Sequence, residues 1–355
     1  MPRLRLAIIG LGTAVQPHAR ALIDLAGSIE VVAAVTRSAA RAAAFAQNFP
    51  FPVTLGMDEV IADPAIDAIL LLTPPNAHLD LAERCLGAGK HVLVEKPLEL
   101  TGARAARIVA AARAADRVLG VVLQNRFRPA VLRLGELIAA GELGAVVSAS
   151  VQVPWWRPQS YYDEPGRGTY ARDGGGVLIT QAIHALDVFR ALVGVSKVEA
   201  AQVATSALHA MEGEDQVTAL VRLGNGAPGS IMATTAAFPG RPEVIDVICE
   251  RATARLEGAA LRVNWHDGRT ERAGEEGGGG SGANVMDFPH DMHRALIADF
   301  AQAVASAADP QTRRAPRVSG EEALATQRLI EDILAADPSW RGPAVRQCNS
   351  GSASV

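Results

Sequence analysis

The first 123 residues alternate between short aliphatic or β-branched runs and longer segments whose apolar residues follow a helical period. The helical segments end in glycine, a common helix terminator. Regular strand–helix alternation is typical of a parallel sheet with helices on both faces. The expected strands are Leu4–Ile9, Ile29–Val35, Ala68–Leu72, His91–Val94 and Val118–Leu123.

The pattern changes after residue 123. Longer runs of alternating polar and apolar residues predict antiparallel strands of an open sheet with one solvated face. These runs cover residues 145–153, 217–223, 229–238 and 243–250, and helices are expected near 129–141, 177–193, 290–307 and 319–336. We therefore predict an α/β protein with an N-terminal doubly wound (Rossmann) domain at 1–123, an α+β substrate-binding and oligomerisation domain at 124–340, and a disordered tail at 341–355.

Composition narrows the classes of protein that fit. The chain has 355 residues and a formal net charge of only −4, with no basic stretch typical of nucleic-acid or membrane binding. Cys85, Cys249 and Cys348 are far apart, and no set of residues has metal-ligand spacing. The apolar part of the N-terminus is too short for a signal peptide. We expect a soluble cytoplasmic protein that binds no metal, nucleic acid or membrane.

The first expected strand runs into a glycine turn, "GLGTA", that opens a helix. Gly10 and Gly12 form the G-x-G of a dinucleotide fingerprint, whose third glycine position holds Val15. Glycine lets the backbone approach a pyrophosphate, which then meets the free N–H groups of the helix N-terminus. Gly10, Gly12, Thr13 and Ala14 are therefore predicted to bind a dinucleotide cofactor.

The second expected strand ends in Thr36, Arg37 and Ser38, where an NAD-type site usually has a carboxylate. Arg37 and Arg41 can instead pair with a 2′-phosphate, which favours NADP over NAD. In the alternative interpretation, Ser38 only caps a helix and Arg37 is merely solvated.

Polar residues and prolines also follow the next two buried strands, in "TPPNAH" and "EKP". The carboxyl ends of parallel strands face one crevice, where ligands bind. Lys96 is therefore expected near a nicotinamide, where its ammonium can donate to a substrate oxygen; a surface ion pair with Glu95 is the alternative. The predicted cofactor contacts on this edge are Thr73, Pro74, Asn76, His78, Glu95 and Lys96.

Four segments stand in an order and at a spacing that resemble one family, the glucose–fructose oxidoreductase/inositol dehydrogenase (Gfo/Idh/MocA) family of NAD(P)-dependent oxidoreductases. They are "GLG…H" (10–18), "TPPNAH" (73–78), "EKP" (95–97) and "GGGVLITQAIHALD" (174–187). The resemblance implies that Lys96 lies in the active site and that the Lys96–Pro97 bond is cis. It also implies a homodimer or homotetramer formed through the C-terminal sheet.

The resemblance assigns His184 as the catalytic acid/base. Family members have an aspartate four residues earlier, where this chain has Thr180. Either another group tunes the proton transfer by His184, or Lys96 carries more of the work. The three glycines before this helix indicate close backbone approach, plausibly to substrate or nicotinamide. The resemblance further places His293 near the substrate, although a structural role at the start of its helix fits equally well.

Aromatic residues are scarce except in "VPWWRPQSYYDEPGRGTY", which suits a sugar-like ring or, alternatively, an interface between subunits. The predicted substrate contacts are Lys96, Trp155, Arg157, Tyr162, Arg172, Thr180, His184 and His293.

These features predict hydride transfer between NAD(P) and a carbinol or carbonyl of a sugar, inositol or sugar derivative. Two alternatives stay open. One is a glycoside-cleaving or epimerising enzyme whose bound cofactor is only transiently reduced. The other is a non-catalytic, nucleotide-sensing regulatory protein.

Overall fold

The computed structural model describes residues 3–275 and 290–341, which divide into two compact units. The first unit contains residues 3–127 and 290–325, and the second contains 128–275 and 326–341. Beyond Arg341, the predicted tail lies outside the described residues, as does most of the glycine-rich segment near residue 280. The first unit therefore differs from the predicted domain, because it also takes in residues 290–325 from the far end of the chain.

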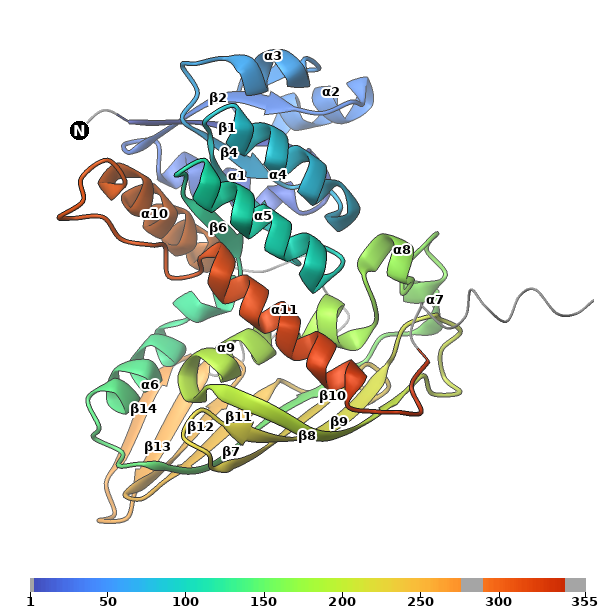
Figure 1. Cartoon of the computed structure of the whole chain (residues 1–355), viewed down its shortest axis with the longest axis vertical. Coiled ribbons are helices and arrows are strands. Elements are labelled where there is room, and N and C mark those ends of the chain that lie inside the picture. Colours follow the sequence, from blue (N-terminus) through green and yellow to red (C-terminus); the bar gives the residue numbers. More distant parts are fainter. Residues whose placement is uncertain (1–2, 276–289, 342–355) are drawn as a thin grey trace, which may run out of the picture. The chain divides into compact units, whose positions relative to one another are not determined.

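A six-stranded parallel sheet forms the centre of the first unit, in the order β3-β2-β1-β4-β5-β6 (Figure 1). This is the order of a doubly wound sheet, as predicted. Strands are added on one side of β1 up to β3 and then on its other side from β4 onward. The central strands are buried on both faces, which explains their near-continuous apolar sequences. The strands are β1 (Leu4–Ile9), β2 (Ile29–Val35), β3 (Val53–Thr54), β4 (Ala68–Leu71), β5 (His91–Glu95) and β6 (Leu119–Val122).

Helices cover this sheet, and one of them comes from the C-terminal part of the chain. Helix α10 packs against α1 and β6, and its Leu296, Ile297 and Phe300 are buried in the same core as β1 and β4. The first unit's helices are α1 (Val15–Asp24), α2 (Ala39–Asn48), α3 (Met57–Ala62), η1 (Pro75–Ala77), α4 (His78–Gly87), α5 (Gly102–Ala114), η2 (Gln124–Phe127), α10 (Asp291–Ser306) and the start of α11 (Gly320–Ala335).

The second unit is built on an eight-stranded sheet in the order β14-β13-β12-β11-β7-β10-β9-β8. All neighbouring strands are antiparallel except β10 and β7, which run parallel, so the predicted mostly antiparallel sheet is confirmed. The strands are β7 (Val146–Pro154), β8 (Val195–Ala204), β9 (Gln216–Leu223), β10 (Pro228–Thr234), β11 (Val244–Cys249), β12 (Ala252–Glu257), β13 (Ala260–Trp265) and β14 (Thr270–Gly274).

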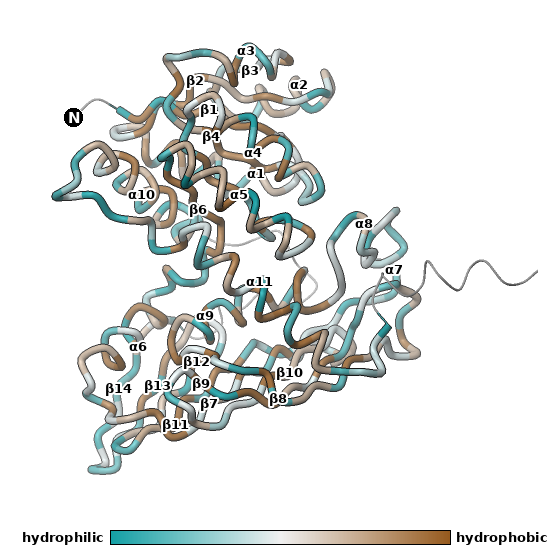
Figure 2. The backbone as a smooth tube through the Cα atoms, in the orientation of Figure 1, coloured by the Kyte–Doolittle hydropathy of each residue, from teal (hydrophilic) through white to brown (hydrophobic). Residues whose placement is uncertain are grey.

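Residues of β9 are exposed and buried in strict alternation. In Figure 2, hydrophilic and hydrophobic colours alternate along the strands of this sheet. The buried face packs against α6 and α9, as the alternating sequence pattern predicts. The helices of this unit are α6 (Pro129–Ala139), α7 (Gln159–Tyr162), α8 (Tyr170–Asp173), the π-helical turn η3 (Leu178–Ala182), α9 (Ile183–Val193) and the remainder of α11.

One helical stretch, Tyr170–Val193, has the length and hydropathy of a membrane span. About two thirds of its most apolar window, 67%, is buried inside the unit, and α9 packs against β7. This burial is that of a core helix.

Candidate functional site

The β1–α1 turn combines a tight backbone contact with open space. Gly10 has φ of +107°, and a Cβ there would lie 2.7 Å from the carbonyl group of Leu72, so only glycine fits. A Cβ on Gly12 would instead meet no atom within 4 Å. Helix α1 begins at Val15 with no side-chain cap and no acidic residue in its first turn, so no carboxylate competes with an anion there. The Val15 N–H donates to the Gly12 carbonyl oxygen, 3.2 Å away, and Pro17 has no N–H. This turn fits a dinucleotide pyrophosphate.

At the end of β2, the Ser38 hydroxyl accepts a hydrogen bond from the Arg41 N–H and caps α2. The Thr36 hydroxyl accepts from the Ser38 N–H, so its side chain stabilises the turn. Arg37 and Arg41 are both exposed. The helix-capping role of Ser38 is thus confirmed, and it leaves both guanidinium groups at the surface beside the strand end.

At the end of β4, the side chain of His78 is fully buried. Its Nε2 lies 2.8 Å from the carbonyl oxygen of Thr73, and its Nδ1 lies 3.1 Å from that of Pro97. Burial lowers the pKa of His78, although hydrogen bonds to these carbonyls oppose the change. His78 therefore joins the loops after β4 and β5 and supports the edge from inside.

Pro74 and Asn76 are exposed on the same loop, while the Thr73 hydroxyl is buried and has no hydrogen-bond partner among the described residues. A buried hydroxyl without a partner is costly, so a ligand at this edge would satisfy it.

The end of β5 carries the Glu95-Lys96-Pro97 motif, and the Lys96–Pro97 peptide bond is cis, as the resemblance implied. His18 of α1 is buried, and its Nε2 lies 3.2 Å from Oε2 of Glu95. Burial raises the pKa of Glu95, but the hydrogen bond from His18 and the charge of Lys96 outweigh this effect and lower it. Glu95 is therefore an ionised carboxylate. It links α1 to the end of β5, directly before Lys96.

His293 of α10 lies in the first unit, with its ring edge-on to that of His18 at a centroid distance of 4.8 Å. Burial lowers the pKa of His293 to about 4, and His18 adds to this effect while Glu95 opposes it. The ring is consequently neutral at pH 7. The predicted substrate histidine thus packs beside the His18–Glu95 pair, next to the cofactor edge.

In the second unit, Gly176, one of the three predicted glycines, approaches another part of the backbone. A Cβ on Gly176 would lie 1.8 Å from the carbonyl oxygen of Glu214. The Glu214 carboxylate accepts hydrogen bonds from the N–H groups of Gly176 and Leu178, both 3.0 Å away. Burial raises the pKa of Glu214 to about 7 despite these donors. The expectation that the glycines approach substrate or nicotinamide was wrong for Gly176, because this segment packs on residues 213–214.

Thr180 and His184 lie on η3 and α9. The Thr180 hydroxyl is 2.5 Å from the carbonyl oxygen of Gly176 and is also bonded to Gln181, whose amide lies near Tyr161. His184 is half-buried, whereas Asp187 is fully buried and accepts a hydrogen bond from Thr326 of α11. Lys96 and His184 belong to different units, and their convergence stays a prediction.

Tyr162 is a buried anchor of the aromatic segment. Its hydroxyl lies 2.7 Å from that of Thr235, and burial raises its pKa to about 12. Its ring packs on His209, whose Nδ1 lies 2.6 Å from Asp215 and whose Nε2 lies 2.8 Å from the carbonyl oxygen of Arg157. Tyr162 therefore supports the neighbouring residues from the interior of the unit. The predicted direct substrate contact does not fit its 6% exposure.

Trp155, Arg157 and Tyr161 form a stack that Arg167 extends. The Arg157 guanidinium lies 5.3 Å from the Trp155 ring and 5.6 Å from the Tyr161 ring, while that of Arg167 lies 4.9 Å from Tyr161. The Nε atoms of both arginines and the Trp155 indole N–H are buried and lack partners among the described residues. Tyr161 and Arg167 were not predicted as site residues, although both lie in the aromatic-rich segment that the sequence singled out.

Arg172, by contrast, is paired within the protein. It lies 2.9 Å from Glu164 and 3.7 Å from Asp173, and it also donates to the carbonyl oxygen of Pro165. This predicted substrate donor therefore holds the 164–173 loop in shape. Among residues 3–275 and 290–341, no group of three or more histidine, cysteine or acidic side chains could hold a metal ion.

The chain belongs to the Gfo/Idh/MocA family of oxidoreductases. Residues 4–123 match the model of the oxidoreductase family with an NAD-binding Rossmann fold, and residues 131–255 match the GFO/IDH/MocA C-terminal domain. The protein is thus an NAD(P)-dependent oxidoreductase by family, and the resemblance that the motifs indicated is confirmed.

Curated relatives include 1,5-anhydro-D-fructose reductase of Ensifer adhaerens, 32% identical over 62% of this chain and 66% of the reductase. Trans-1,2-dihydrobenzene-1,2-diol dehydrogenase of Mus musculus is 30% identical over 64% of this chain and 67% of that enzyme. Among solved structures, the WlbA dehydrogenase of Bordetella pertussis, in complex with NADH and UDP-GlcNAcA, is 26% identical and has a TM-score of 0.77, with 94% and 96% of the two chains covered.

Replacing His18 tests whether its contact with Glu95 stabilises the first unit. His18→Ala leaves the carboxylate without this donor, and we expect the free energy of unfolding to fall by about 1–3 kcal/mol. His18→Gln, whose amide nitrogen can reach the position of Nε2, serves as the matched control and is expected to lose less. Urea unfolding measures both variants, and equal losses would show that packing alone, without the hydrogen bond, accounts for the role of His18.

Proposed function

We propose that this protein is a dehydrogenase or reductase that interconverts a carbinol and a carbonyl in a sugar, inositol or sugar derivative, with NADP as the preferred cofactor. The observation that carries the proposal is the edge of the first sheet. There, open space at Gly12 and an uncapped α1 follow the carboxyl end of β1, and the Lys96 motif follows that of β5, with only β4 between the two strands. Family membership and the names of the relatives support the reaction class.

The first unit supplies the binding groups for the cofactor. The α1 N–H groups receive the pyrophosphate, and Thr73 with the exposed Pro74–Asn76 loop borders the nicotinamide side. When bound, the nicotinamide provides the hydride-accepting or hydride-donating carbon. The buried His18–Glu95 and His78 contacts keep this edge in place when a ligand arrives.

Lys96 and His184 divide the work on the substrate oxygen in this proposal. The Lys96 ammonium donates a hydrogen bond to that oxygen and stabilises its negative charge as the carbinol is oxidised. The His184 imidazole accepts the hydroxyl proton and returns it in the reverse direction. Thr180 cannot hold the positive charge on His184 as an aspartate would, and its hydroxyl is engaged with Gly176. Lys96 therefore carries a larger share of the charge stabilisation here.

The rings of Trp155 and Tyr161 and the guanidinium of Arg167 are the proposed platform for a polyhydroxylated substrate, because all three side chains are partly exposed. Aromatic faces bind the C–H side of a ring. Arg157 is only 6% exposed, so its guanidinium holds the two rings in place. The Arg167 guanidinium, which also pairs with Glu164, provides donors for hydroxyl groups.

Cofactor choice follows from the end of β2. No carboxylate stands there to bind the ribose hydroxyls or repel a phosphate, whereas Arg37 and Arg41 are exposed beside it. A guanidinium forms strong bidentate hydrogen bonds with a phosphate, which supports NADP.

The uncovered face of the second sheet is the proposed surface for a homodimer or homotetramer. Leu220 of β9 and Ile248 of β11 are 56% and 45% exposed, and each is flanked along its strand by buried residues. Apolar side chains on the open face of a sheet favour packing against a second copy.

The activity is tested by assaying sugars, inositols and sugar acids with NADP and NAD, and following the absorbance of the reduced nicotinamide. With a substrate found, Lys96→Ala and His184→Asn are each expected to lower kcat/KM by about a hundredfold to a thousandfold, because each removes transition-state stabilisation or proton transfer. Arg107→Gln, an exposed helix position in α5, serves as the control variant.

Full activity in both variants would contradict these roles. Substrate conversion with no net change in reduced cofactor would instead identify the glycoside-cleaving or epimerising reaction. Cofactor binding without any turnover across the panel would favour a nucleotide-sensing protein.

A separate prediction concerns the 2′-phosphate. Arg37→Asp replaces a cation with a repelling carboxylate, so the affinity for NADP is expected to fall by about tenfold or more. The affinity for NAD, which lacks this phosphate, should stay within about twofold of its original value. Isothermal titration calorimetry with both nucleotides measures the two affinities. An equal loss of affinity for NAD would show that Arg37 does not bind the 2′-phosphate.

A further inference from the structure

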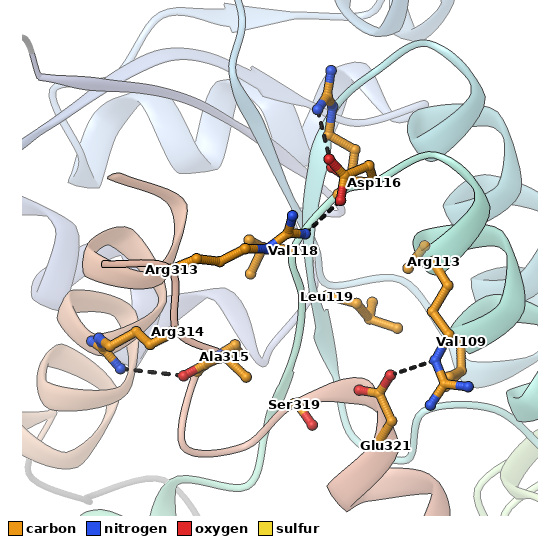
Figure 3. Close-up of a pocket in the computed structure, with 13 residues that line it drawn as sticks. Val109, Arg113, Asp116, Val118, Leu119, Arg313, Arg314, Ala315, Ser319 and Glu321 are labelled. Atoms are coloured by element: carbon orange, nitrogen blue, oxygen red, sulfur yellow. Dashed lines mark hydrogen bonds and ion pairs between the residues drawn. The ribbon is translucent and has the colours of Figure 1, made fainter. Parts of the chain in front are cut away.

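A cavity lies at the opposite edge of the first sheet, away from the predicted cofactor groups. It has a volume of about 220 Å³ and is bordered by the end of α5, the start of β6, the segment 313–316 and the first turn of α11 (Figure 3). Its lining residue Leu119 begins β6, whereas Val122, at the other end of that strand, pairs with Glu95. Three residues of a strand separate the two regions by about 10 Å.

The charge of this cavity differs in sign from that of the chain. Four arginines line it, Arg113, Arg117, Arg313 and Arg314, against the two carboxylates Asp116 and Glu321. That leaves a surplus of two positive charges among the lining residues, and of one when Asp299, which pairs with Arg314, is counted, in a protein whose formal net charge is −4. A local positive surplus attracts anions more strongly than the protein as a whole does.

The arginines differ in how firmly other residues fix their side chains. Arg314 is fixed by Asp299, Gln302 and two backbone carbonyl groups, so it shapes the wall. Arg113 pairs with Glu321, and Arg313 pairs with Asp116; in both pairs the side chains are 46–70% exposed. Exposed ion pairs contribute little to stability, so an incoming anion can replace either carboxylate at small cost.

The floor between these arginines is apolar. Figure 3 shows Leu119 lying between Arg313 on one side and Arg113 on the other. The remaining apolar lining residues are Val109, Ala112, Val118, Ala315 and Pro316. The volume of about 220 Å³ is below the roughly 300–1,000 Å³ of sites for drug-sized ligands, so a compact ligand fits.

We propose that this cavity binds a small organic anion, with an apolar body against Leu119 and Val118 and a carboxylate or phosphate group on the guanidinium of Arg313. The site is independent of the dinucleotide edge and of the proposed reaction. Its ligand displaces Asp116 from that guanidinium, so this carboxylate acts as an internal competitor.

Calorimetric titration of the full chain with benzoate tests the site, with neutral benzamide and inorganic phosphate as comparison probes. Benzoate should bind more tightly than either, because only benzoate combines charge with an apolar body. Arg313→Gln should weaken benzoate binding about tenfold, the typical effect of losing a charge-assisted hydrogen bond. Asp116→Asn should strengthen it up to about fivefold, and asparagine tolerates the positive φ of 52° at this residue.

Arg107→Gln is the matched control. Arg107 is an exposed, ion-paired arginine on α5, the helix that also carries Arg113, and it does not line the cavity. It should leave the benzoate affinity unchanged. Benzoate binding that is undetectable, or equal in the original protein and Arg313→Gln, would overturn the site. Equal binding of inorganic phosphate would overturn the assignment to an organic anion, since the floor would then contribute nothing.

Discussion

The contact between the Glu95 carboxylate and His18 is the interaction on which the cofactor edge depends. Glu95 ends β5 and is followed by Lys96, while His18 lies inside α1, the helix whose N-terminus is the predicted pyrophosphate site. The contact therefore couples the position of α1 to the position of the lysine. The neutral ring of His293 packs against His18 and brings α10 into the same cluster.

The second unit uses buried carboxylates in a comparable way. Glu214 holds the start of the η3–α9 segment through two backbone N–H groups, and Asp215 holds His209, which binds the Arg157 carbonyl oxygen beneath the aromatic stack. Two consecutive acidic residues thus support both the helix that carries His184 and the platform that carries Tyr161. The packing of Tyr162 on His209 and its bond to Thr235 add to this support.

Much of the fold could be predicted because the strands of the first sheet are continuous apolar runs, and those of the second sheet alternate between polar and apolar residues. The strands Leu4–Ile9 and Ile29–Val35 were predicted with their observed bounds. The helical period of residues 291–306 correctly indicated a helix, but a period shows only that one face is apolar, and it does not show which sheet that face covers. The two-residue strand β3 is too short to give a pattern.

The sequence correctly indicated an unusual backbone at Gly10 and an exposed charge at Arg37, while their contacts with a cofactor stay a prediction. The candidate site was less predictable where residue type alone suggested a ligand contact. Gly176 approaches a neighbouring backbone, and the Tyr162 hydroxyl points to Thr235; both outcomes depend on long-range packing. The stacking of Arg167 on Tyr161 likewise depends on the path of the 163–170 loop, which sequence spacing does not determine.

The central claim is that the space beside Gly12 holds the cofactor. The most direct test is to measure NADP affinity by calorimetry for Gly12→Ala, together with the melting temperature. The added methyl group meets no protein atom within 4 Å, so the melting temperature should not change. It would occupy the space assigned to the pyrophosphate, so the dissociation constant should rise by roughly tenfold or more. An unchanged dissociation constant would contradict the claim.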